Sequence, residues 1–112
     1  MTDDKLAALG KKAARAKRWR WLPGMLTTDG LRVLDAPPDA PATPDFSDAP
    51  TFGGLVAIFR ATGKDFYIKP AFNAADEQIW EFGYKSDTEY VWSIYSGATQ
   101  LEALISALVN LQ

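Results

Sequence analysis

The chain contains neither cysteine nor histidine. The first absence excludes disulfides, cysteine-ligated zinc and thiol nucleophiles. The second removes the commonest general base and every catalytic triad that depends on it. We therefore predict a protein that is not an enzyme and that has no catalytic residue, no metal site and no cofactor. Catalysis by carboxylates alone is the remaining enzymatic alternative.

Long hydrophobic runs are also missing. No apolar segment approaches the roughly 20 residues that a membrane-spanning helix needs, and the N-terminus lacks the uninterrupted apolar core of a signal peptide. At 112 residues the chain is sized for one domain, which can fold without disulfides. These features predict a soluble, cytoplasmic protein with no membrane partner.

Acidic residues are scarce at the start of the chain. Residues 1–20 hold seven Lys or Arg and two Asp, a net charge of +5, whereas the other residues hold five basic and twelve acidic side chains, a net charge of −7. This asymmetry indicates either an anionic partner or attraction to the acidic body of another copy. The expected phosphate contacts, together with one base-stacking tryptophan, are Lys11, Lys12, Arg15, Lys17, Arg18, Arg20 and Trp19.

Residues 3–18 predict a helix, because they are rich in alanine and place Asp3 and Asp4 at the positive end of the helix dipole. Their apolar stripe is thin and includes Gly10, so we expect weak docking and interpret residues 1–18 as a basic helical arm. Trp19, which follows the arm, is the ambiguous residue. It could stack on a base or be buried beside three expected anchors, Trp21, Leu22 and Met25.

Residues 19–112 are expected to form a single α+β domain. The Asp29-Gly30 pair predicts a hairpin of 25–28 with 31–35. Residues 36–50 hold five of the seven prolines and predict an extended loop.

Two further helices are predicted from their first residues. Asp48 is a good N-cap for a helix over 49–62. A capping box of Thr99 and Glu102 predicts the C-terminal helix. The helix over 49–62 is expected to bury Phe52, Leu55, Val56 and Phe59.

Three segments with alternating apolar residues, at 65–72, 78–85 and 89–95, predict an antiparallel meander. The expected core face consists of Phe66, Ile68, Phe72, Trp80, Phe82, Tyr84, Tyr90, Trp92 and Ile94. Because paired residues point to the same side of a sheet, this core requires a turn over about 86–88 and a single register between 78–85 and 89–95. The expected pairs are Tyr84 with Tyr90, Phe82 with Trp92, and Trp80 with Ile94.

The fold class is therefore α+β: an N-terminal helix and hairpin, then α-β-β-β-α with a three-stranded antiparallel meander packed on helices. The helices cover one sheet face and leave the other to solvent or to a partner. On that outer face the candidate contacts are Tyr67, Lys69 and Tyr95, which could stack bases as sheet-based RNA binders do, or meet a protein. A plain solvated face, or one covered by the hairpin, is the alternative.

Several segments carry a resemblance to known families. "RWRWLPGMLTTDG" at 18–30, "DAPTFGGLVAIFR" at 48–60 and a T-x-x-E-A-L helix start at 99–104 resemble a family of small phage and prophage proteins that has no established activity. Residues 97–104 are also similar to a helix start of HicB-type antitoxins. The order α-β-β-β-α is shared with the double-stranded RNA-binding domain, although the lysine cluster of that family is replaced here by Thr99-Gln100-Leu101-Glu102.

The phage resemblance implies a small protein that acts by binding host or phage macromolecules in the cytoplasm of the bacterial host. We expect a non-enzymatic protein-interaction role, accessory or host-modulating, with a protein partner. The alternative is a nucleic-acid-binding accessory protein that uses the basic arm. Self-association of the arm with the acidic body of a second copy would make a homo-oligomer.

Overall fold

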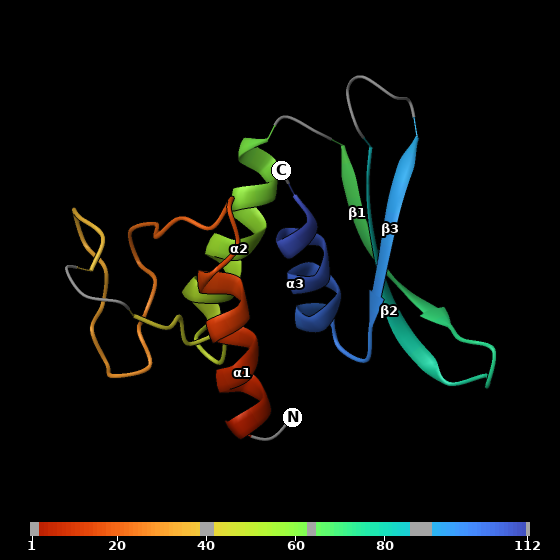
Figure 1. The fold of residues 1–112 in the computed structure, drawn as a ribbon, viewed down its shortest axis with the longest axis horizontal. Coiled ribbons are helices and arrows are strands. Elements are labelled where there is room, and N and C mark those ends of the chain that lie inside the picture. Colours follow the sequence, from red (N-terminus) through yellow and green to blue (C-terminus); the bar gives the residue numbers. More distant parts are fainter. Residues whose placement is uncertain (1–2, 39–41, 63–64, 86–90, 112) are drawn as a thin grey trace.

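The computed structural model describes residues 3–38, 42–62, 65–85 and 91–111. Within them the chain forms three helices and a three-stranded antiparallel sheet of order β1-β2-β3, which confirms the α+β class. The helices and strands, in chain order, are α1 (Asp3–Ala14), α2 (Ala49–Ala61), β1 (Phe66–Phe72), β2 (Gln78–Lys85), β3 (Trp92–Gly97) and α3 (Gln100–Asn110). All three helices lie on one side of the sheet (Figure 1).

Helices α2 and α3 begin at the caps that the sequence predicts. The Asp48 carboxylate accepts a hydrogen bond from the backbone N–H of Thr51, and the Thr99 hydroxyl accepts one from the N–H of Glu102. Each cap satisfies an N–H group that has no partner inside its own helix. Helix α2 buries Leu55 and Phe59 as predicted, together with Thr51 and Ile58, but leaves Phe52 and Val56 only half-buried.

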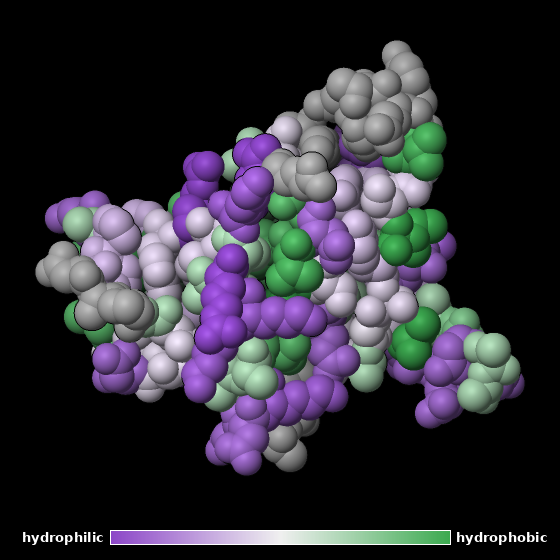
Figure 2. All heavy atoms as spheres, in the orientation of Figure 1, coloured by the Kyte–Doolittle hydropathy of each residue, from purple (hydrophilic) through white to green (hydrophobic). Residues whose placement is uncertain are grey.

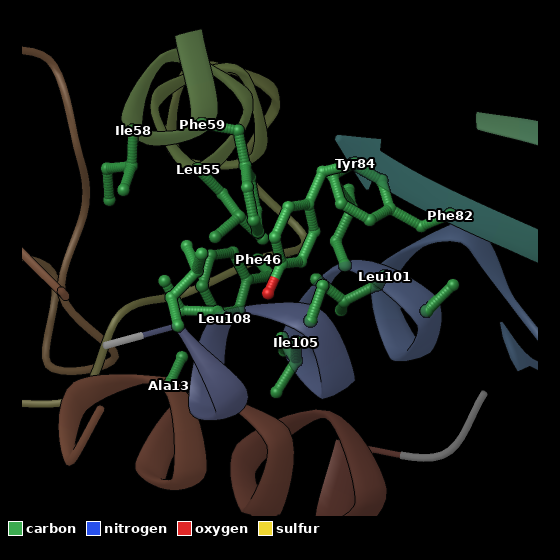
Figure 3. Packing of buried hydrophobic residues seen from close by; sticks show 14 of the residues in the cluster. Ala13, Phe46, Leu55, Ile58, Phe59, Phe82, Tyr84, Leu101, Ile105 and Leu108 are labelled. Atoms are coloured by element: carbon green, nitrogen blue, oxygen red, sulfur yellow. The ribbon is translucent and has the colours of Figure 1, made fainter. Parts of the chain in front are cut away.

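Helix α3 is the centre of the hydrophobic core (Figure 3). It lies between the sheet on one side and α1 and α2 on the other (Figure 1). The ring of Phe59 on α2 lies 4.6 Å from that of Phe82 on β2, so α2 also reaches the sheet directly. The buried side chains labelled in Figure 3 are Ala13, Phe46, Leu55, Ile58, Phe59, Phe82, Tyr84, Leu101, Ile105 and Leu108.

Helix α1 is docked more closely than its thin apolar stripe predicts, and it ends at Ala14 instead of residue 18. Ala13 is completely buried. A Cβ atom at Gly10 would lie 2.6 Å from the carbonyl oxygen of Pro44, so the glycine permits a close approach to the proline-rich loop. Lys5 forms an ion pair of 2.8 Å with Glu102 of α3. Helix α1 is therefore packed on the rest of the fold.

The predicted hairpin is present as a single bridge between Leu26 and Arg32. The proline-rich loop runs beside it, because Thr27 forms a second bridge with Pro44. Phe46 then anchors this loop in the core with 6% of its surface exposed. The hairpin and loop lie beyond the helices, on the side away from the sheet, and so do not cover the outer sheet face (Figure 1).

The predicted register of β3 is wrong. Phe82 pairs with Tyr95, Tyr84 with Ser93 and Trp80 with Gly97, a shift of three residues from the expected pairs. An odd shift exchanges the two faces of a strand, so Tyr95 points toward the helices and Trp92 and Ile94 point outward. The turn expected at 86–88 lies outside the described residues.

The approach of α3 explains this register. A Cβ atom at Gly97 would lie 2.6 Å from Cβ of Glu102 and 2.7 Å from the backbone nitrogen of Ala103. Only glycine fits against the first turn of α3 at this distance. With Gly97 facing α3, the alternation of the strand turns Ser93 and Tyr95 to the same inner side.

Candidate functional site

Tyr67 lies across Gly83 on the outer face of the sheet. A Cβ atom at Gly83 would lie 2.5 Å from Cε1 of Tyr67, so the absence of a side chain makes room for the ring. The centre of that ring is 5.2 Å from the ring of Trp92 on β3. Gly83 therefore lets an aromatic side chain from β1 reach across β2 to the edge strand.

Glu81 holds the Tyr67 ring in position. The Tyr67 hydroxyl donates a hydrogen bond of 2.7 Å to Oε2 of Glu81, and this bond to a carboxylate raises the pKa of Tyr67 above its ordinary value. Nζ of Lys69 lies 3.6 Å from the same carboxylate oxygen and 5.4 Å from the centre of the Tyr67 ring. The two opposite charges compensate each other beside the ring.

Tyr67, Lys69, Trp92 and Ile94 together line a shallow hollow of about 380 Å³, which we name the aromatic platform. Trp92 is 42% exposed and Ile94 is 56% exposed. Figure 2 shows hydrophobic residues spaced along the right-hand side of the molecule, where the sheet lies. Large apolar side chains exposed together on one face are typical of a binding surface.

The structure brings together two of the three predicted sheet-face residues. Tyr67 and Lys69 lie on the outer face, as expected, but Tyr95 lies on the helix-facing side, where its ring stacks 6.0 Å from that of Tyr84. Burial, followed by the interaction with Tyr84, raises the pKa of Tyr95. Trp92 and Ile94 take its place on the outer face. Sequence reasoning missed this exchange, because the close fit of Gly97 to α3 is a tertiary contact.

A second surface gathers part of the predicted basic set. A hollow of about 870 Å³ lies between the end of α1 and the last residues of α3. We name it the basic hollow. Figure 2 shows hydrophilic residues over α1, with hydrophobic atoms beside them in the middle of this face. Its lining consists of Lys11, Lys12, Arg15 and Lys17 with Ala8, Ala16, Val109, Asn110 and Leu111.

The remaining members of the basic set lie outside this lining. Arg18 and Arg20 are exposed residues that follow it in the chain. Trp19 is half-buried, and its ring packs edge to face on Phe46 at 5.8 Å and on Trp21 at 5.4 Å. Its indole nitrogen is buried without a hydrogen-bond partner among the described residues. The ring therefore packs on two other aromatic side chains and is only partly exposed.

In the described part of the chain, no three acidic residues gather closely enough to hold a metal ion. No described helix has both the length and the hydrophobicity needed to cross a membrane. Comparisons with protein-family models, with curated proteins and with solved structures found no match to this chain.

Proposed function

We propose that the chain is a non-enzymatic binding protein that recognises another protein through the aromatic platform. The observation that carries this proposal is the exposure of Trp92 and Ile94 beside Tyr67 on a sheet face that no described helix covers. Tryptophan is enriched among the residues that dominate protein-protein binding energy. A binding role also agrees with a sequence that lacks histidine and cysteine.

The two edges of the sheet differ in a way that supports the same role. Strand β1 carries Lys69 and Pro70, a charge and a missing N–H group that oppose pairing with another strand. Strand β3 carries neither a charge nor a proline from Trp92 to Gly97. Its free edge can therefore accept an extended segment of a partner, whose side chains would then rest on the platform.

Mixed but compensated charges make the platform more suitable for a protein than for a phosphate backbone. Glu81 pairs with Lys69, and its carboxylate would repel phosphate groups at the centre of the face. In keeping with the phage resemblance, we propose an accessory or host-modulating role in the cytoplasm of a bacterial host.

The test compares two double variants of the full chain as baits in a bacterial lysate. Trp92→Ser with Ile94→Ser alters the platform, while Leu31→Ser with Leu34→Ser alters two exposed apolar residues of the hairpin, which are 55% and 69% exposed. A protein enriched by the wild type should be lost with the first variant and kept with the second.

The enriched protein is then purified and titrated calorimetrically. We expect at least about tenfold weaker binding for the platform variant, since residues at the centre of an interface contribute about 1–2 kcal/mol or more each. Equal binding of both variants, or no protein enriched by the wild type, would contradict the proposal.

A further inference from the structure

The basic hollow concentrates four cations that have no ion-pair partner among the described residues. Lys11, Lys12, Arg15 and Lys17 line it, and no acidic residue stands among its described lining residues. None of these four side chains forms an ion pair with a described residue, whereas Lys5, Arg32 and Lys69 each have a carboxylate within 4 Å. Within the described part of the chain, these four positive charges are therefore not engaged in ion pairs that hold the fold together.

Helix dipoles account for only part of this charge. The C-terminal ends of helices α1 and α3 both lie beside the hollow. The C-terminal end of a helix carries roughly half a negative charge. The two ends together offset about one of the four positive charges. Asp3 and Asp4 lie at the opposite end of α1 and do not contribute to the lining. Counted over the described lining residues, a net positive charge of about three is left for a ligand.

We infer that the basic hollow binds the phosphate backbone of a double-stranded nucleic acid. A hollow of about 870 Å³ is large enough for several neighbouring phosphates, and Arg20, three residues after Lys17 in the chain, is a further exposed cation. The Trp19 ring is half-buried and packed on Phe46, which limits its stacking on an unpaired base and favours a duplex over a single strand. The contacts are thus to phosphate only, and binding is independent of base sequence.

This site is separate from the aromatic platform, and its test is independent of the protein partner proposed above. The probe is a fluorescein-labelled duplex of about 20 base pairs, titrated by anisotropy at several salt concentrations between about 50 and 200 mM. Neutralising four phosphates predicts a slope of log K against log salt of about −3.6. Two unrelated duplex sequences should bind equally.

The variant Lys12→Gln with Arg15→Gln removes two cations from the hollow. It should weaken binding by about tenfold or more at about 50 mM salt and bring the slope closer to zero by about 2. Arg60→Glu on α2 makes the same change in net charge outside the hollow and should alter affinity by no more than about twofold. Circular dichroism and urea unfolding check that all variants are folded.

Any of four results would overturn the inference. The first three are no binding of the duplex at about 50 mM salt, an equal loss in the hollow variant and in Arg60→Glu, and binding that does not respond to salt. A single-stranded probe that binds more tightly than the duplex would also overturn it, because it would require stacking. Light scattering tests the alternative occupant, the acidic body of a second copy. If the chain binds no duplex, and its mass in solution falls both with added salt and in the variant Lys12→Gln with Arg15→Gln, the hollow is assigned to that second copy.

Discussion

Phe82 of β2 lies directly opposite Tyr95 of β3. Directly paired residues point to the same side of a sheet, so both rings face the helices. The same register leaves Trp92 and Ile94 on the outer face beside Tyr67. This one pair therefore decides which residues of the edge strand belong to the core and which are available to a partner.

The two faces of β3 should respond differently to substitution. Ile94→Ser on the outer face should change the free energy of unfolding by less than about 1 kcal/mol. Tyr95→Ser should lower it by about 2 kcal/mol or more, and Phe82→Ala, which removes a fully buried ring, by about 3–5 kcal/mol. Urea unfolding followed by circular dichroism measures all three. A larger loss for Ile94→Ser than for Tyr95→Ser would favour the register in which Phe82 pairs with Trp92.

Two helical glycines offer a matched test of how α1 docks. A Cβ atom at Gly53 of α2 would meet no atom of another described segment within 4 Å, so Gly53→Ala should stabilise the protein by up to about 1 kcal/mol through helix propensity. Gly10→Ala in α1 brings the same gain in propensity, but its Cβ would lie 2.6 Å from the Pro44 carbonyl oxygen. We expect a net loss of stability and a partly released α1. Equal stabilisation by both substitutions, measured by thermal unfolding, would show that α1 does not pack against the loop.

Thr51 ties the hairpin to the start of α2 through a buried hydroxyl. That hydroxyl accepts a hydrogen bond of 2.8 Å from the backbone N–H of Leu26 and donates one of 2.8 Å to Asp48. Thr51→Val keeps the shape, leaves the Leu26 N–H without this acceptor and removes one of the hydrogen bonds to Asp48, which should cost about 1–3 kcal/mol in urea unfolding. Thr28→Val, at an exposed position, should stay within about 0.5 kcal/mol. Similar values for the two variants would assign Thr51 a packing role only.

Acid should destabilise the fold through two carboxylates. The hydrogen bond from Arg32 lowers the pKa of Asp48, and the one from Lys5 lowers the pKa of Glu102. A carboxyl with a lower pKa in the folded state adds stability above its unfolded pKa, and this contribution is lost as the pH falls through the folded pKa.

We therefore expect Tm, measured by calorimetry, to decline below the ordinary pKa values of 3.8 for Asp48 and 4.5 for Glu102. The double variant Asp48→Asn with Glu102→Gln should start from a lower Tm near neutral pH and lose less of it on acidification. A decline as steep as that of the wild type would mean that other groups control the acid response.

Part of the candidate site could be predicted from the sequence, and part could not. Tyr67 and Lys69 were placed correctly, because alternation along one strand determines its faces. Trp92 and Ile94 were assigned to the core on their hydrophobicity, since burial of the larger apolar residues is the usual outcome. The sequence showed how many basic residues lie near the start of the chain. It could not show which of them line the same hollow.

The sequence by itself determined the elements whose signals lie within a few residues of each other. The caps at Asp48 and Thr99 and the turn at Asp29-Gly30 depend on hydrogen bonds and backbone conformations that are local to those segments. Only the tertiary structure decided the inner face of β3 and the docking of α1. Both depend on a glycine that admits a separate segment, Gly97 against α3 and Gly10 against Pro44, and such close approaches become visible only when the segments are packed together.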